Sequence, residues 1–285
     1  AVFAKVVQVF TDSFRATVIA ARMVNVLLGC GMAWFTWKIG ELLFRKKETG
    51  RLFAVLVCFL PGTCFLFSYI NTDGLALFTT AWVLYCWCRA CKEGWTLKVC
   101  VQMGIAMGLC MLSYYNAYGY ILCSVLICLS SAILNKMDAK EIAKKTLIVA
   151  SVAFVVAGWW FVRNVILYDG DILGTKTQNE YGNKYAMEQY KPSVRKTPEN
   201  SNESLWHMLD DDAWIHITAR SFVGMFGCQN ILMSNKIYYA YFCIWMIGGI
   251  GCLLKFKELF IYKKEEKNKY LLNYTFVIAI IIPII

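Results

Sequence analysis

Residues 146–167, TLIVASVAFVVAGWWFVRNVIL, form an apolar run that contains a single charged side chain, Arg163. A helix needs about 20 apolar residues to cross the hydrocarbon core of a bilayer. The run has this length, so it predicts a membrane-spanning helix. Similar apolar runs lie on both sides of it, and this repetition indicates the class of the whole chain.

The composition of the chain supports the same class. Of its 285 residues, 59% are apolar and 17% are charged, and the mean hydropathy is +0.50, whereas charged residues make up about 25% of soluble domains. A soluble fold would leave large apolar patches exposed, and a membrane β-barrel would show short alternating strands. Disorder, collagen, a coiled coil and a small disulfide scaffold are likewise excluded. We therefore predict an all-α, polytopic transmembrane helical bundle.

Hydropathy predicts about eight spans within a single transmembrane domain, residues 1–285. The chain begins with Ala1, and residues 276–285 stop inside an apolar run too short to cross a bilayer. We therefore expect a chain truncated at both ends. The predicted spans cover residues 17–38, 52–69, 75–90, 98–113, 119–134, 146–167, 237–254 and 271 onward.

Basic residues distinguish the two faces of the predicted bundle. Of the 29 Lys and Arg residues, 18 lie beside alternate connections, within residues 38–51, 89–98, 136–145 and 255–269. The positive-inside rule makes this face cytoplasmic and places the amino end outside. Because the basic residues cluster in membrane loops, the net charge of +10 predicts an orientation in the bilayer and no nucleic-acid partner.

The opposite face holds two short loops, 71–74 and 114–119, and one long polar loop, 169–236, which we expect to be extracytoplasmic. Residues 1–16 place apolar side chains on one helical stripe. This pattern predicts an amphipathic helix on the outer leaflet. The alternative is the tail of a longer membrane helix.

The 13 cysteines lie mostly inside the apolar runs, where they suit packing between helices. Cys86, Cys88 and Cys91 form a close group at one predicted helix end. A metal or redox role is the alternative for this group, although no His lies nearby to complete a zinc site.

Asp73 is the first candidate site residue, in the segment SYINTDG at 68–74. On an outer loop its carboxylate could act as a general base in a cavity at the membrane surface, or as a metal ligand. It could equally cap the helix that follows. Asn71 and Gly74 suit a tight turn there.

Two arginines lie near the same face. Arg163, in WWFVRN at 159–164, is about one turn inside the predicted interface. A guanidinium group matches a phosphate in a bidentate fashion, so Arg163 could hold a lipid phosphate. The alternative is a side chain that extends to the headgroup region. Arg22 has the same two interpretations, with the second favoured.

Further polar candidates follow in two outer segments. Asp169 and Asp171, in LYDGDILG at 167–174, could bind a divalent cation or activate a hydroxyl group, but a solvated turn is favoured. Asn116 and the tyrosines around it could contact a sugar, and an interfacial aromatic belt explains the tyrosines equally well.

Three segments resemble the GT-C superfamily of membrane glycosyltransferases. They are SYINTDG at 68–74, WWFVRNVILYDGDILG at 159–174 and RSFVGMFGCQN at 220–230. The likeness is to bacterial membrane proteins related to protein O-mannosyltransferases and aminoarabinose transferases. It implies a bacterial plasma-membrane protein whose active site faces outward.

The resemblance also implies a reaction. A sugar would pass from a polyprenyl-phosphate donor to an acceptor hydroxyl group or lipid outside the cytoplasm. Asp73 would be the catalytic carboxylate and Arg163 the contact to the lipid phosphate, with Arg22, Asn71, Asn116, Asp169 and Asp171 as further substrate contacts. A divalent cation could assist. The family's main catalytic acid would lie before Ala1.

Two other functions compete with transfer. A transporter or flippase for a lipid-linked sugar should show polar residues at mid-bilayer and internal repeats, which this sequence lacks. A non-catalytic membrane assembly subunit should tolerate the replacement of Asp73 and Arg163.

Overall fold

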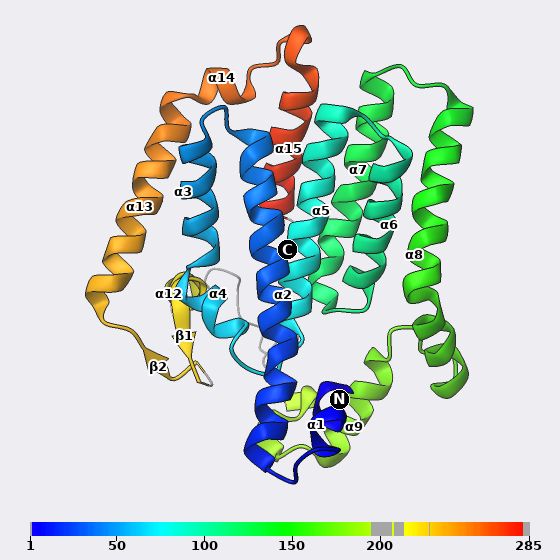
Figure 1. Cartoon of the computed structure of the whole chain (residues 1–285), viewed down its shortest axis with the longest axis vertical. Helices are drawn as coiled ribbons and strands as arrows, with labels where there is room; N and C mark the ends of the chain where they lie inside the picture. The colour runs from blue at the N-terminus through cyan, green and yellow to red at the C-terminus, as the bar shows by residue number, and fades with distance from the viewer. Residues whose placement is uncertain (1, 195–206, 208–213, 228, 282–285) are drawn as a thin grey trace.

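The computed structural model describes residues 2–194, 207, 214–227 and 229–281, and it is a helical bundle (Figure 1). The predicted all-α membrane architecture is confirmed. The helices are α1 (Val2–Gln8), α2 (Phe14–Leu43), α3 (Lys47–Cys58), α4 (Pro61–Leu66), α5 (Asp73–Glu93), α6 (Leu97–Met111), α7 (Tyr118–Leu134), α8 (Ala139–Leu167), α9 (Thr175–Tyr185), α12 (Trp214–Gly224), α13 (Asn235–Leu254), α14 (Phe256–Phe260) and α15 (Lys267–Ile281).

Within the described residues, five helical segments are long and apolar enough to cross a membrane. They are α2, α5, α8, α13 and the segment Tyr115–Leu134, which includes α7. Helices α3, α6 and α15 have 12, 15 and 15 residues. The chain is therefore a multi-pass membrane protein, whereas the predicted count of eight spans is not shown.

Two predicted segments have different boundaries in the structure. The predicted span 52–69 is interrupted between α3 and α4, because Pro61 lacks an N–H group and starts a new helix as its first residue. The predicted interfacial helix 1–16 ends at Gln8. Helix α2 then begins at Phe14, after Ser13, whose hydroxyl oxygen accepts a hydrogen bond from the Ala16 N–H at 3.4 Å.

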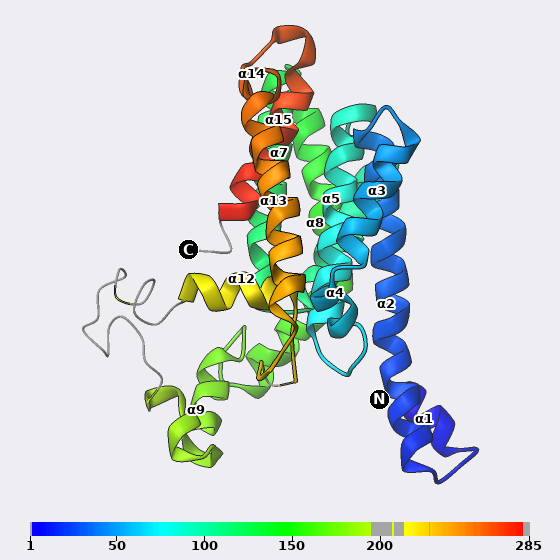
Figure 2. The ribbon, with the colours of Figure 1, turned by 90° about the vertical axis from the view of Figure 1, so that its left-hand side faces the viewer.

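The stretch predicted as a polar loop, 169–236, contains regular structure. Helix α9 lies beyond the end of α8, and α12 runs across the bundle axis beside α4 (Figure 2). After α12, strands β1 (Met225–Phe226) and β2 (Ile231–Leu232) pair antiparallel, with Met225 opposite Leu232. Residues 195–206 and 208–213 of this stretch lie outside the described residues.

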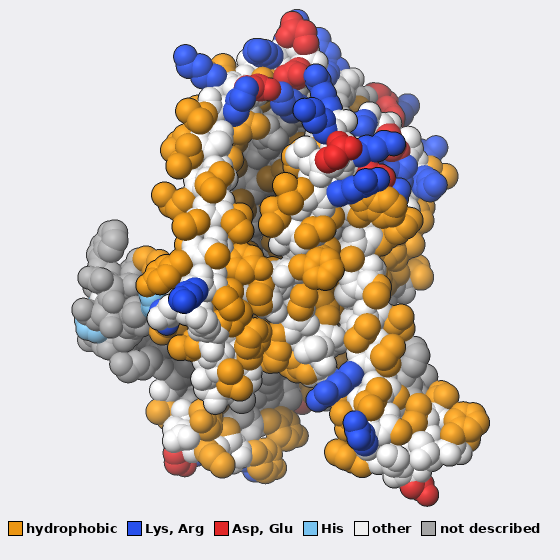
Figure 3. All heavy atoms as spheres, turned by 60° about the vertical axis from the view of Figure 1, so that its left-hand side comes forward, with side chains coloured by type: hydrophobic (Ala, Val, Ile, Leu, Met, Phe, Trp, Pro, Cys, Tyr) orange, Lys and Arg blue, Asp and Glu red, His pale blue; other side chains and the backbone are white. Residues whose placement is uncertain are grey.

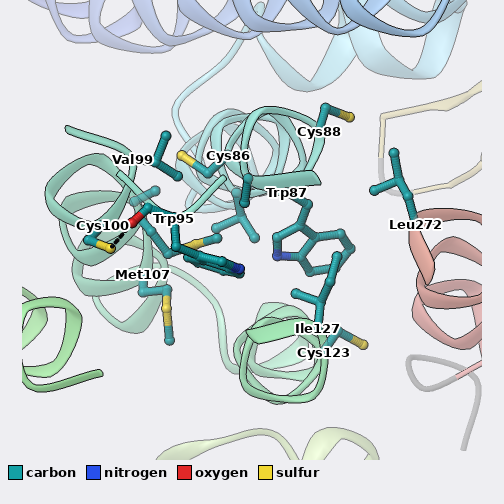
Figure 4. Packing of buried hydrophobic residues seen from close by; sticks show 14 of the residues in the cluster. Cys86, Trp87, Cys88, Trp95, Val99, Cys100, Met107, Cys123, Ile127 and Leu272 are labelled. Atoms are coloured by element: carbon teal, nitrogen blue, oxygen red, sulfur yellow. Dashed lines mark hydrogen bonds between the residues drawn. The ribbon is translucent and has the colours of Figure 1, made fainter. Parts of the chain in front are cut away.

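The core lies among α5, α6, α7 and α15, with two buried tryptophans at its centre (Figure 4). The indole N–H of Trp87 donates to Ser124 Oγ at 2.9 Å, and that of Trp95 donates to Ser131 Oγ at 3.0 Å. Both acceptors belong to α7. An unpaired indole N–H would be costly in lipid. These bonds therefore determine how α5 and the segment at Trp95 pack against α7. Cys86, Cys88, Cys100 and Cys123 fill space around them.

Helix α8 packs closely on α6 at two glycines, Gly104 and Gly108, in the sequence GIAMG. A Cβ atom at Gly104 would lie 2.8 Å from the carbonyl oxygen of Val149, and one at Gly108 would lie 3.0 Å from that of Ala153. Small residues spaced by four allow such close contact between membrane helices. Helix α8 is therefore held mainly by α6.

Basic residues gather at one end of the bundle (Figure 3), and in the sequence many of them lie in or beside the turns that join α2 to α3, α5 to α6 and α7 to α8. Several of them pair with carboxylates of the same helix, as Arg89 does with Glu93 and Lys145 with Glu141. The end that carries Asp73 and the α8–α9 connection is opposite. The charge asymmetry expected from the sequence is present, and its assignment to the cytoplasmic side stays a prediction.

The α6–α8 contact yields a stability prediction. Gly108→Leu should lower the free energy of unfolding by about 1–3 kcal/mol, because the new side chain has no space against Val156. The matched control is Gly249→Leu in α13, where no atom lies within 4 Å of the position that a Cβ atom would take. Reversible denaturation in bicelles would measure both, and equal stability of the two variants would contradict the prediction.

Candidate functional site

Asp73 lines a cavity with a volume of about 890 Å³. Helices α2, α3, α4, α5, α12 and α13 surround it together with the β1–β2 hairpin. Its polar side chains are those of Thr63, Tyr69, Asp73, Ser221, Gln229 and Tyr241. Its remaining wall is apolar and includes Met32, Leu56, Val57, Leu60, Leu77 and Ile244. The cavity thus offers one polar and one apolar environment.

The loop before α5 fixes the position of Asp73. Asn71 Oδ1 accepts a hydrogen bond from the Gly74 N–H at 2.9 Å, and Asn71 Nδ2 donates to the Leu66 carbonyl at 2.6 Å. Asp73 is the first residue of α5, after the N-cap Thr72, and its negative charge is favourable at that helix end. Asp73 can therefore stabilise the start of α5 and also face the cavity. The Asn71 side chain supports the loop, and its predicted contact with substrate stays a prediction.

A residue that the sequence analysis missed holds this loop to α2. Asn25 is 5% exposed, and its Nδ2 donates to the carbonyl oxygens of Tyr69 and Asn71. An amide inside an apolar helix needs such partners. The polar Asn25 in the run 17–38 was the available signal, but its partners are 44 and 46 residues away in sequence.

Another side of the cavity is formed where α4 contacts α12. A Cβ atom at Gly62 would lie 3.1 Å from the carbonyl oxygen of Phe222 and 3.2 Å from that of Val223. Glycine at this position lets the end of α12 reach α4. The close approach closes one side of the cavity that Asp73 lines.

Arg220 is a second residue that the sequence analysis did not single out within RSFVGMFGCQN. It precedes the cavity residue Ser221 on α12, and its guanidinium lies over the ring of Tyr238, 5.2 Å from the centroid. Its Nη2 donates to Asn235 Oδ1 at 3.2 Å, whereas its buried Nε has no hydrogen-bond partner among the described residues. The Tyr238 hydroxyl donates to the Gly224 carbonyl at 2.8 Å. This cluster joins α12 to α13.

Arg163 lies beside a different cavity, of about 380 Å³, at the end of α8. Its Nη1 donates to Asn164 Oδ1 at 3.2 Å, and its guanidinium lies 5.0 Å from the ring centroid of Trp160 and 5.8 Å from that of Tyr168. Helix α8 packs on α6, at the side of the bundle opposite α13 (Figure 1). The structure therefore does not bring Arg163 and Asp73 into one pocket.

Two further predicted contacts, Arg22 and Asn116, lie at the surface of the protein. Arg22 is exposed on α2, three residues before Asn25. Asn116 is exposed in the short 3₁₀ helix Tyr115–Ala117 between α6 and α7. Neither residue lines the cavity of Asp73 or that of Arg163. Their proposed substrate contacts stay predictions.

Asp169 and Asp171 lie in a turn that joins α8 to α9, as favoured from the sequence. Asp169 is exposed and has a φ of 47°. Asp171 Oδ2 accepts hydrogen bonds from the N–H of Thr177 at 2.9 Å and from its hydroxyl at 3.0 Å. The backbone bond from Thr177 lowers the pKa of the Asp171 carboxyl below its ordinary value. Asp171 thus stabilises the first turn of α9.

No group of three His, Cys, Asp or Glu side chains among the described residues is arranged to hold a metal ion. Cys86 and Cys88 are buried in the core, and Cys91 packs against it. Asp73 is the single carboxylate among the described residues that line its cavity. Hard divalent cations prefer several oxygen ligands, so these residues do not form a cation site by themselves.

The Asn25 contact predicts that this residue holds the loop. Asn25→Leu should lower the free energy of unfolding by about 1–3 kcal/mol, because two buried carbonyl groups lose their donor. Hydrogen exchange of residues 69–74 should accelerate at the same time. Asn179→Leu, at an exposed position in α9, serves as the control. Unchanged exchange of the loop in Asn25→Leu would refute the assignment.

The Asp171 contact predicts a pH dependence at the start of α9. Because the folded-state pKa is below the ordinary value of 3.8, the contact stabilises α9 above that pH and is lost as the pH falls through the lower, folded-state pKa. Exchange of the Thr177 amide, corrected for its intrinsic rate, should lose protection in this acid range. In Asp171→Ala the protection should be low at every pH. The prediction would be wrong if protection of the Thr177 amide changed neither with pH nor in Asp171→Ala.

Comparison with known proteins places the chain in a family without giving it an activity. No curated protein and no solved structure matches the chain. A family described as predicted membrane protein (DUF2142) matches residues 1–285. That match and the helical membrane architecture agree, and the chain belongs to this family of predicted membrane proteins.

Proposed function

We propose that the protein is an integral membrane glycosyltransferase that moves a sugar from a polyprenyl-phosphate donor to an extracytoplasmic acceptor. The observation that carries the proposal is the placement of Asp73 on a cavity lined by both polar and apolar side chains. The resemblance of 68–74, 159–174 and 220–230 to GT-C enzymes supplies the reaction class.

The cavity suits an amphiphilic substrate. Its volume of about 890 Å³ is within the range of small-molecule sites, roughly 300–1,000 Å³. Among the apolar lining residues, Leu56 and Val57 belong to α3 and Ile244 to α13, and both helices expose further large apolar side chains, such as Leu52 and Ile247. A donor could place its chain against these apolar side chains and its sugar beside Asp73. The position of the cavity, opposite the basic end, is consistent with an outward-facing site.

The chemistry assigned to Asp73 is general-base catalysis. The acceptor hydroxyl oxygen forms a bond to the anomeric carbon while the bond between that carbon and the phosphate oxygen breaks. The Asp73 carboxylate takes the hydroxyl proton, and polyprenyl phosphate leaves with the bonding electron pair. Arg220 lies on α12, directly before the cavity residue Ser221. Because Asp73 is the single carboxylate in the described lining, no step is assigned to a divalent cation.

Replacement of the base tests this proposal. Asp73→Asn keeps the shape of the side chain but removes its basicity, so transfer of labelled sugar from a polyprenyl-phosphate donor should fall about 10²- to 10⁴-fold. Asp138→Asn, at an exposed position at the basic end, is the matched control and should retain activity. Both variants should remain folded in detergent at the temperature of the assay.

Two results would speak against the proposal. Full turnover by Asp73→Asn would remove Asp73 from the reaction. A parent protein that transfers no sugar, but carries a lipid-linked sugar across vesicle bilayers, would favour the transporter alternative.

A further inference from the structure

An apolar groove lies between α8 and its neighbours α6 and α7, away from the cavity of Asp73. Its volume is about 390 Å³, and its lining includes Met103 and Met107 of α6, Val125 and Leu129 of α7, and Phe154 of α8. Along α8 the lining extends from Thr146 to Phe161, which corresponds to about 22 Å at 1.5 Å per residue. The groove exists because α8 packs on the glycines of α6.

The groove and the small cavity beside Arg163 lie on one face of α8. The groove residues of this helix repeat at intervals of three and four, and they end at Ala157, Gly158 and Phe161. The next positions in the same pattern, Asn164 and Tyr168, line the small cavity. An apolar groove is thus followed, along one helix face, by a cavity with polar and aromatic walls.

The small cavity presents groups that bind polar headgroups. Thr177, Gln178 and Tyr181 of α9 contribute a hydroxyl, an amide and a phenol to its wall. The Arg163 guanidinium adjoins it through Asn164, Trp160 and Tyr168. Among the described residues no carboxylate forms an ion pair with Arg163, and the Asp171 carboxylate is engaged by Thr177. The positive charge is therefore available to an anionic ligand.

We infer that this face of α8 is a second lipid site, which binds an anionic phospholipid from the bilayer. Its apolar chain lies in the α6–α7–α8 groove, and its phosphate contacts Arg163 at the rim of the small cavity. The hydroxyl groups of the headgroup meet the polar side chains of α9. The site lies apart from the cavity of Asp73, so the inference does not depend on the proposed transferase activity.

Charge and shape favour this occupant. A cation at the end of an apolar groove, near the membrane boundary, complements the phosphate and chain of one lipid molecule. A helix of another protein, with a diameter of about 10 Å, would cover the groove but leave Arg163 without a negative partner. Free phosphate would leave the groove unused.

Native mass spectrometry of the full chain can test the site, with phosphatidylglycerol and phosphatidylcholine added at equal concentration. The parent protein should retain phosphatidylglycerol preferentially. Arg163→Gln should reduce this preference about fivefold, the effect of one basic residue near a membrane surface. Ala150→Trp, which fills an exposed position of the groove, should reduce retention of both lipids.

Two matched variants control for charge and bulk. Arg15→Gln removes an exposed cation from α2, and Val155→Trp adds bulk to the outer face of α8, where Val155 is 77% exposed. Both should retain phosphatidylglycerol as the parent does, and so should Asp73→Asn. Parent-like retention by both Arg163→Gln and Ala150→Trp would overturn the inference. The inference would also be overturned if Arg15→Gln and Val155→Trp lost as much bound phosphatidylglycerol as Arg163→Gln and Ala150→Trp. Binding would then depend on the total charge of the protein and on its exposed area, and not on this site.

Discussion

Close backbone contact at glycine is the constraint on which the arrangement of this bundle depends. Apolar side chains gain little by moving from lipid to a neighbouring helix, so packing and hydrogen bonds must hold membrane helices together. Gly104 and Gly108 let α6 approach α8, and Gly62 lets α4 approach the end of α12. The first contact leaves the lipid groove beside α7, and the second closes the cavity of Asp73. Both candidate sites are consequences of these approaches.

Hydrogen bonds between distant segments make the contacts specific. Asn25 ties α2 to the loop before α5, and Trp87 and Trp95 donate to serines of α7. Each bond satisfies a polar group that lipid would leave unpaired. These bonds lie in the half of the bundle around α5, whereas α8 and α13 form its two edges (Figure 1). The cavity and the groove occur at these two edges.

The separation of Asp73 from Arg163 changes how the two residues are understood. Their positions in sequence place both at the end opposite the basic loops, and the resemblance to GT-C enzymes assigns both to one reaction. In the folded chain one lines a cavity beside α12, and the other adjoins a cavity beside α9. A cavity for reaction and a separate place for an anionic lipid account for both residues without a shared pocket.

The sequence alone was enough to predict the membrane class, the helical architecture and the gathering of basic residues at one end. These properties follow from the length of apolar runs and from charge counts in loops, which are local quantities. It also indicated the turn at Asp169 and Asp171, since the DG pair is a local turn signal. The break at Pro61 was missed, because the hydropathy of the run 52–69 does not register a single proline.

Tertiary structure alone decided which polar residues share a cavity. The partners of Asn25 are more than 40 residues away in sequence. Helix α12 contacts α4 at a glycine, although the two segments are about 160 positions apart. The hydropathy of the chain does not indicate which helices pack against each other. Helix order gives each residue a depth in the membrane. The position of a helix around the bundle depends on side-chain shape at every interface, and that position separated Asp73 from Arg163.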